Sequence, residues 1–136
     1  AVAAENITRH GLDEQVSLLC GDLFDPIVEG LDAARFDLVV SNPPYVSDLE
    51  YEQLDKNVRD YEPRTALHAG PDGLDVYRRI LEQVDDFLKP DGALMLEIGY
   101  AQGPAIRHML ETAGAFAEIA IEKDFANNDR IAIAKK

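Results

Sequence analysis

The sequence predicts an α/β domain with a mostly parallel sheet that ends in an antiparallel hairpin. Short apolar runs of strand length alternate with longer amphipathic stretches of helix length, a pattern typical of parallel sheets. The last two strand-like runs, 116–121 and 130–134, follow each other with no helix between them. The chain has 136 residues, of which 46% are hydrophobic, so it is long enough for one domain with a buried core.

The first third of the chain is expected to hold one helix and two strands. A helix over 1–10 ends at Gly11, because glycine readily adopts the left-handed conformation that terminates helices. The apolar run 16–20 predicts a strand, with 21–26 as the loop at its carboxyl end. The run 36–41 predicts the next strand.

The rest of the chain alternates between turns, helices and strands. Residues 48–61 are polar and acidic, and so long a loop is typical of a lid or a substrate-binding surface. Glycine and proline turns at 70–73 and 89–92 flank an amphipathic helix over 74–88. The elements expected after the second turn are a strand over 93–98, a helix over 103–113 that ends at Gly114, and the hairpin strands over 116–121 and 130–134.

The strand over 36–41 runs directly into Asn42-Pro43-Pro44-Tyr45, at the edge of a parallel sheet where α/β folds bind their ligands. Proline has a fixed φ and no N–H, so Pro43 and Pro44 stiffen the loop and leave its carbonyl groups free to accept hydrogen bonds. Asn42 adds a side-chain carbonyl, and Tyr45 adds a flat apolar ring with a polar tip. Two acceptors and a ring suit a planar –NH2 group, so we interpret the motif as a binding site for an amide or amino nitrogen.

The net charge of −13 limits the kinds of partner that fit this chain. There are 26 acidic residues against 13 basic ones, and no basic run occurs. Nucleic-acid binding takes much of its affinity from Lys and Arg side chains that neutralise phosphates. We therefore expect a protein or small-molecule substrate and no direct contact with nucleic acid.

Composition also bears on metals, membranes and compartment. His10, His68 and His108 are scattered without the spacing of metal ligands, so we predict no metal site. No apolar stretch approaches the roughly 20 residues that a membrane span needs, so we expect no membrane partner. The single Cys20 has no partner for an internal disulfide, which favours a reducing, cytoplasmic location.

Asn-Pro-Pro-Tyr at the end of a strand resembles the catalytic motif of the S-adenosylmethionine (SAM)-dependent methyltransferases that modify planar nitrogens. The tetrapeptide alone is shared by enzymes that act on the adenine amine and enzymes that act on the glutamine side-chain amide. Beyond it, the sequence resembles the HemK/PrmC family, the glutamine methyltransferases of peptide chain release factors. The segments that carry this resemblance are Ala4-Glu5-Asn6, Asp22-Leu23-Phe24, Ser41 to Val46, Val58 to Pro63, Gly70 to Ile80, Leu96 to Gly99, Gln102-Gly103, Lys123-Asp124 and Asp129-Arg130.

The resemblance implies a Rossmann-like SAM-dependent methyltransferase fold. It also implies a reaction in which SAM donates a methyl group to the side-chain amide of the Gln in a Gly-Gly-Gln motif of a release factor. The implied site residues are Asn42 and Pro43 for catalysis, Asn42, Pro43, Pro44 and Tyr45 for substrate binding, and Asp22, Leu23 and Asn42 for SAM binding.

Two acidic features lie near this motif in the expected fold. Glu97 closes a strand at the same sheet edge, where it either supports the site or is simply solvated. The acidic run Asp48, Glu50, Glu52 and Asp55 is either a solvated face or a docking surface for a basic part of the release factor.

A glycine-rich loop near the start of the fold normally holds SAM, and these 136 residues contain no stretch of the GxGxxG type. We therefore expect residues 1–136 to be the carboxyl-terminal part of a catalytic domain, and to be inactive by themselves. Three other functions stay open. They are an adenine-amino methyltransferase acting on nucleic acid, a ribosomal-protein glutamine methyltransferase, and a module that only binds a partner.

Overall fold

The computed structural model describes residues 2–30 and 35–136 of the chain. These residues fall into two compact units, Ala1–Ala34 and Arg35–Lys136, and each unit is described by itself.

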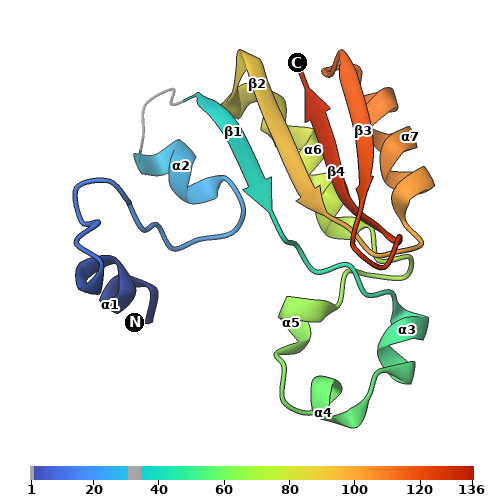
Figure 1. Cartoon of the computed structure of the whole chain (residues 1–136). Coiled ribbons are helices and arrows are strands. Elements are labelled where there is room, and N and C mark those ends of the chain that lie inside the picture. Colours follow the sequence, from blue (N-terminus) through green and yellow to red (C-terminus); the bar gives the residue numbers. More distant parts are fainter. Residues whose placement is uncertain (1, 31–34) are drawn as a thin grey trace. The chain divides into compact units, whose positions relative to one another are not determined.

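The first unit contains two helices, α1 (Val2–Arg9) and α2 (Asp25–Gly30) (Figure 1). Helix α1 confirms the helix predicted over 1–10, and Gly11 ends it with a φ of +64°. The backbone N–H of Gly11 donates to Thr8 O and that of Leu12 donates to Ile7 O, which is the pattern of a Schellman cap. Helix α2 was not predicted, although Asp25 followed by Pro26 suits a first helical turn.

The strand predicted over 16–20 is wrong. This segment has no regular secondary structure, and Val16, Leu18 and Leu19 are 42%, 56% and 45% exposed. An apolar run becomes a strand only when a neighbouring strand accepts its backbone hydrogen bonds. No strand within residues 2–30 and 35–136 pairs with this segment, so hydrophobicity alone does not give it a strand conformation.

The second unit is built on a four-stranded sheet with the order β1-β2-β4-β3. Its strands are β1 (Phe36–Ser41), β2 (Leu88–Glu97), β3 (Glu118–Lys123) and β4 (Asp129–Lys135). The pair β1·β2 is parallel, whereas β4 is antiparallel to both β2 and β3. Strands β1, β2 and β3 therefore run in one direction and β4 runs against them (Figure 1), which confirms the predicted fold class.

Strand β2 starts earlier than predicted. The turn expected at 89–92 lies inside the strand as an irregularity, because Phe36 pairs with Leu88 whereas Leu38 already pairs with Ala93. The extra residues loop out tightly at Gly92, where an added Cβ would lie 2.9 Å from Phe36 O. A local turn signal and a strand pairing therefore coexist in the same segment.

Helices α6 (Asp75–Phe87) and α7 (Gly103–Ala113) cover one face of this sheet (Figure 1). Alternate residues of β2 point to them, because a strand presents every second side chain to the same face. The buried core of the second unit comprises Ala69, Tyr77, Ile80, Val84, Leu88, Leu94, Leu96, Ile98, Ile106, Leu110, Ala132 and Ala134. Burial of this apolar stripe is what holds the two helices on the sheet.

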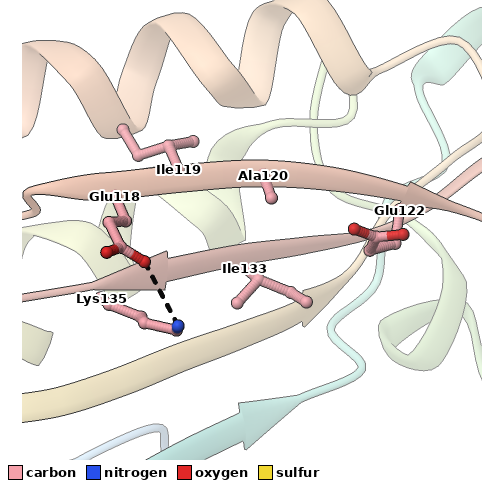
Figure 2. A pocket seen from close by; sticks show the side chains of 6 residues that line it. All are labelled: Glu118, Ile119, Ala120, Glu122, Ile133 and Lys135. Atoms are coloured by element: carbon pink, nitrogen blue, oxygen red, sulfur yellow. Dashed lines mark hydrogen bonds and ion pairs between the residues drawn. The ribbon is translucent and has the colours of Figure 1, made fainter.

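The opposite face of the sheet is more open. Leu38 and Val40 of β1 are exposed there, Val40 at 67%. A shallow hollow of about 350 Å³ lies on this face over β3 and β4, and Lys135 forms an ion pair with Glu118 at 3.2 Å beside it (Figure 2). None of the predicted site residues lines this hollow.

Three short helices join β1 to α6: α3 (Asp48–Gln53), α4 (Lys56–Arg59) and α5 (Arg64–Leu67). Helices α3 and α4 lie within the polar segment 48–61, which was expected to be a loop that forms a lid or a substrate-binding surface, and α5 follows it. Helix α3 begins with a capping box, in which Ser47 Oγ accepts from the N–H of Glu50 and Glu50 accepts from the N–H of Ser47. Asp55 caps α4 by accepting from the N–H of Asn57 at 2.8 Å.

Tyr77 connects helix α6 to the end of β2. Its ring is fully buried, and its hydroxyl donates to the backbone carbonyl of Glu97 at 2.8 Å. Burial raises the pKa of the Tyr77 hydroxyl well above its usual range, and the nearby charges of Tyr45 and Glu97 raise that pKa further. Tyr77 therefore remains protonated in the folded protein at a pH where an unfolded tyrosine has ionised.

This burial predicts an alkaline loss of stability. Above the unfolded pKa of about 10 the unfolded state binds fewer protons than the native state, so the free energy of unfolding falls as pH rises. Tyr77 contributes a slope of at most about 1.4 kcal/mol per pH unit, which Tyr77→Phe should remove. Urea unfolding between about pH 9 and 11.5 measures this slope, with Tyr61→Phe, at an 83% exposed position, as the matched control. Equal slopes in the wild type and Tyr77→Phe would contradict the prediction.

Candidate functional site

The predicted motif lies where two parallel strands end. Ser41 pairs with Leu96, so Asn42 follows β1 beside the last residue of β2, Glu97. Asn42 is exposed, Pro43 is buried, and Pro44 and Tyr45 are half-buried. The loop is thus anchored by a proline while the amide of Asn42 is accessible to a ligand.

A cavity of about 340 Å³ adjoins the motif and brings it together with the segment that follows. All four residues of Asn42-Pro43-Pro44-Tyr45 line it. The remaining lining residues are Val46, Leu54, Val58, Ala66 and Leu67. An apolar cavity with a few polar groups at one wall is the usual form of a small-ligand site. The segment expected to be a lid therefore forms one wall of the candidate site.

Backbone hydrogen bonds fix the exit of the loop. The N–H of Val46 donates to Leu67 O at 2.8 Å, and the N–H of Ala69 donates to Val46 O at 2.9 Å. The N–H of Asp48 donates to Gly70 O at 3.1 Å. These bonds make an isolated parallel bridge between Val46 and His68. The bridge joins the start and the end of the segment that contains α3, α4 and α5.

Gly73, in the predicted turn at 70–73, lies against the backbone of Tyr45 in the motif loop. It has a φ of +73°, and an added Cβ would overlap the carbonyl oxygen of Tyr45. Both the left-handed backbone and the close approach require glycine here. The turn therefore does more than start α6, because it also determines how near the backbone of Tyr45 can lie.

Glu97 supports the site rather than being simply solvated. The hydroxyl of Tyr45 donates to Glu97 Oε1 at 3.4 Å, and the backbone carbonyl of Glu97 accepts from Tyr77. Tyr45 also lines a second cavity of about 130 Å³ together with Leu54, Tyr100 and Gln102. Tyr45 thus lines both cavities, and its hydroxyl is held by Glu97.

One polar cluster of the lid segment was missed in the sequence. His68 Nε2 lies 2.6 Å from Asp48 Oδ1, and the rings of His68 and Tyr51 meet edge to face at 5.8 Å. The guanidinium of Arg64 lies 5.3 Å from the Tyr51 ring centre. His68 was considered only as a metal ligand, and residues this far apart in sequence give no local signal of contact.

The residues predicted to border SAM belong to both units. Asn42 lies in Arg35–Lys136, whereas Asp22 and Leu23 lie in Ala1–Ala34. Leu23 has a φ of +48°, a left-handed conformation that costs roughly 1–2 kcal/mol for a residue with a Cβ. Beside it, Phe24 is buried. Strain of this kind is concentrated at ligand-binding loops, so it agrees with a functional role for this loop.

The described parts of the chain contain neither a metal-binding cluster nor a membrane-spanning helix. Within residues 2–30 and 35–136, no group of three or more His, Cys, Asp or Glu side chains is arranged to hold a metal ion. No helix in these residues has the length and apolar character required to cross a membrane.

Curated relatives share most of this chain. A release factor glutamine methyltransferase of Caulobacter vibrioides is 41% identical over 136 residues, which are 100% of this chain and 45% of the relative. One of Clostridium acetobutylicum is 42% identical over 137 residues, 98% of this chain and 47% of the relative. One of Enterococcus faecalis is 45% identical over 101 residues, 74% of this chain and 36% of the relative. No family model matches the chain. The chain spans a little under half the length of the first two of these relatives.

The close approach of Gly73 to Tyr45 predicts that Gly73→Ala loses stability by steric overlap, in addition to the loss from backbone strain. Gly73→Ala and Gly114→Ala both place a Cβ in a left-handed residue, with φ of +73° and +69°. Each should destabilise the fold by roughly 1–2 kcal/mol for this reason. Gly114 has its nearest neighbour at 4.0 Å, so only Gly73→Ala should lose roughly a further 1–3 kcal/mol from overpacking. Urea unfolding midpoints measure the difference, and equal losses would contradict the argument.

Proposed function

The chain belongs to the family of release factor glutamine methyltransferases, and on this basis we propose that it forms part of an enzyme that transfers a methyl group from SAM to a glutamine of peptide chain release factors. The proposed target is the side-chain amide of the Gln in the Gly-Gly-Gln motif. The observation that carries the proposal is the exposed Asn42, which follows a strand end and lines a cavity together with Pro43, Pro44 and Tyr45.

The chemistry of the amide explains why these residue types suit the reaction. An amide nitrogen is a poor nucleophile because its lone pair is delocalised into the carbonyl. Asn42 Oδ1 and the carbonyl of Pro43 would accept the two N–H hydrogens and hold the nitrogen in one orientation. Positioning of this kind contributes up to about 7–11 kcal/mol at best. The oriented acceptors also stabilise the positive charge that grows on the nitrogen.

The substrate side chain also has to be kept in place while the methyl group is transferred. Pro44 and Tyr45 would complete the pocket around the amide, since the stiff proline and the ring give it flat apolar walls. A strong general base is not needed before the transfer, because the proton can leave afterwards. Glu97, which ends the strand beside Asn42, is consistent with this, since its carboxylate accepts a hydrogen bond from Tyr45.

Asp22, Leu23 and Asn42 are the residues of this chain that we propose to border SAM. A carboxylate, a strained loop and an amide are suited to hydrogen bonding and to packing against the adenosine part of the molecule. SAM, when bound, supplies an electrophilic methyl group on a sulfonium sulfur. A glycine-rich loop for its methionine part is not among these 136 residues. We propose that residues 1–136 are a partial catalytic domain. The complete enzyme, here called the natural-length protein, would provide this loop.

Charge is consistent with a protein substrate. The chain carries a net charge of −13, and the acidic run of the lid, Asp48, Glu50, Glu52 and Asp55, lies next to the segment that walls the cavity. Such a surface would attract a basic part of a release factor rather than the phosphates of a nucleic acid. Because release factors work on the ribosome in translation termination, the reaction is assigned to the cytoplasm.

The first functional prediction concerns Asn42. Asn42→Ala in the natural-length protein should lower the rate of methyl transfer about 10²–10³-fold, because one of the two acceptors that hold the amide disappears. The fold should be little affected, since Asn42 is exposed. Transfer of radiolabelled methyl from SAM to a release factor measures the rate. Asn57→Ala, which removes an exposed asparagine of α4, is the matched control. Activity of the Asn42 variant within threefold of wild type would mean that something else holds the amide.

The second functional prediction concerns the class of substrate. The natural-length protein should methylate a protein that contains Gly-Gly-Gln and leave duplex DNA and RNA unmodified at physiological salt. The physical reason is that an acidic surface offers no counter-charge to phosphates. The protein that contains Gly-Gly-Gln, the two nucleic acids and a ribosomal protein are incubated side by side with SAM, and mass spectrometry of each measures the outcome. Methyladenine in the nucleic acid, or a methylated ribosomal-protein glutamine with the release factor unmodified, would overturn the assignment.

A further inference from the structure

We propose that Gln102 is a positioning residue for methyl transfer, which holds the Asn42–Tyr45 loop against the turns that start α6 and α7. This role rests on the proposed function. Gln102 lies outside the motif, 57 residues from Tyr45 in sequence, and it does not line the cavity next to Asn42.

The amide of Gln102 joins three segments of backbone. Its Nε2 donates to the carbonyl oxygen of Tyr45 at 3.0 Å and to that of Gly73 at 3.3 Å. Its Oε1 accepts from the N–H of Gly99 at 2.9 Å. One side chain thus connects the motif loop, the turn before α6 and the turn after β2. Its donors and its acceptor are all used.

Gln102 lies at the start of α7, yet its side chain binds other segments and not its own helix. Gln102 is the N-cap residue of α7, where a side chain normally accepts from the first backbone N–H groups of its own helix. Its side chain makes no such hydrogen bond, and α7 starts without a side-chain cap. The amide is therefore directed to the loop at the expense of the helix, which is not expected of a residue whose role is to stabilise α7.

The chemistry at this position requires an amide of this length. Two carbonyl oxygens need a donor, and one N–H needs an acceptor, so neither a carboxylate nor an ammonium group meets both demands. A glutamate would have nearly the same shape and could still accept from Gly99. Its second oxygen would face the carbonyl oxygens of Tyr45 and Gly73, and the loop would be pushed away. The half-buried position of Gln102 reduces the access of water that would weaken this repulsion.

The consequence for the reaction follows from the place of Tyr45. Its carbonyl is held by Gln102, and its hydroxyl is held by Glu97. Loss of the first contact frees the backbone directly after Pro43 and Pro44. In the proposed mechanism the carbonyl of Pro43 helps to hold the amide, and Pro44 forms part of the pocket around it. A displacement of about 1 Å in such a contact can lower a rate about 100-fold even though the substituted residue does not touch the substrate.

The test uses two variants of the natural-length protein, Gln102→Glu and Gln102→Met. The first reverses the polarity of the group that faces the two carbonyls, and the second removes all three hydrogen bonds without adding charge. Gln83→Glu, a half-buried position near the far end of α6, is the matched control for the change of charge. Steady-state kinetics with a release factor, titration calorimetry with SAM, thermal melting and hydrogen exchange of the N–H groups of residues 46–48 are measured for each.

Both Gln102 variants should lower kcat about 100-fold, with the KM for release factor and the dissociation constant for SAM within threefold of wild type. Both should also exchange the N–H groups of residues 46–48 faster than the control does. A kcat within threefold of wild type, or loss of the folded state in both variants, would overturn the positioning role and leave a purely structural one. Unchanged exchange would overturn it as well, and this measurement does not depend on activity. Failure of the proposed function itself is recognised separately, because the wild type would then leave the release factor unmethylated.

Discussion

The parallel pairing of β1 with β2 determines where the candidate site residues of Arg35–Lys136 lie. In a parallel pair the carboxyl ends of both strands reach the same edge of the sheet, so Asn42 and Glu97 become neighbours although they are far apart in the chain. The pairing in turn depends on three buried side chains, Leu94 and Leu96 of β2 and Ile98 directly after it, which attach α6 and α7 to the sheet. The position of the site therefore depends on this core. Tyr77 connects the two directly, because its ring packs in the core and its hydroxyl donates to the backbone carbonyl of Glu97.

The sequence predicted those parts of the fold that local physics decides. The helices α6 and α7 and the hairpin β3–β4 follow from hydrophobic periodicity and glycine stops, and the structure confirms them. The segment 16–20 is different, because its apolar run reads as a strand only if another strand accepts its hydrogen bonds. Periodicity carries no information on that partner. The same limit explains the turn at 89–92, which pairing with Phe36 draws into β2.

The candidate site, like the fold, was predictable only where it depends on neighbouring residues in the sequence. Asn42-Pro43-Pro44-Tyr45 is a continuous motif, so its place after a strand and its acceptor chemistry could be inferred from sequence. The groups that hold it come from elsewhere in the chain: Gly73 approaches the backbone of Tyr45, and Gln102 bridges Tyr45, Gly73 and Gly99. Each of these contacts depends on the three-dimensional path of the backbone. Gly73, Gly99 and Gln102 lie in segments that carry the family resemblance, but residue type alone does not say which backbone atoms they approach, because glycine and glutamine are both common at turns and helix starts.

The two consecutive prolines have an electrostatic consequence. Pro43 and Pro44 remove two backbone N–H groups in a row from the loop, while its carbonyl groups remain. The dipoles of these carbonyls are therefore not balanced by neighbouring donors, and Glu97 adds a carboxylate close by. The carbonyl dipoles and the carboxylate each contribute negative potential at this sheet edge. Between two ligands of the same shape, this edge therefore favours the cationic one, and it does so before any specific contact is made. In the proposed function, the loop would therefore favour a ligand by the sign of its charge as well as by hydrogen bonding.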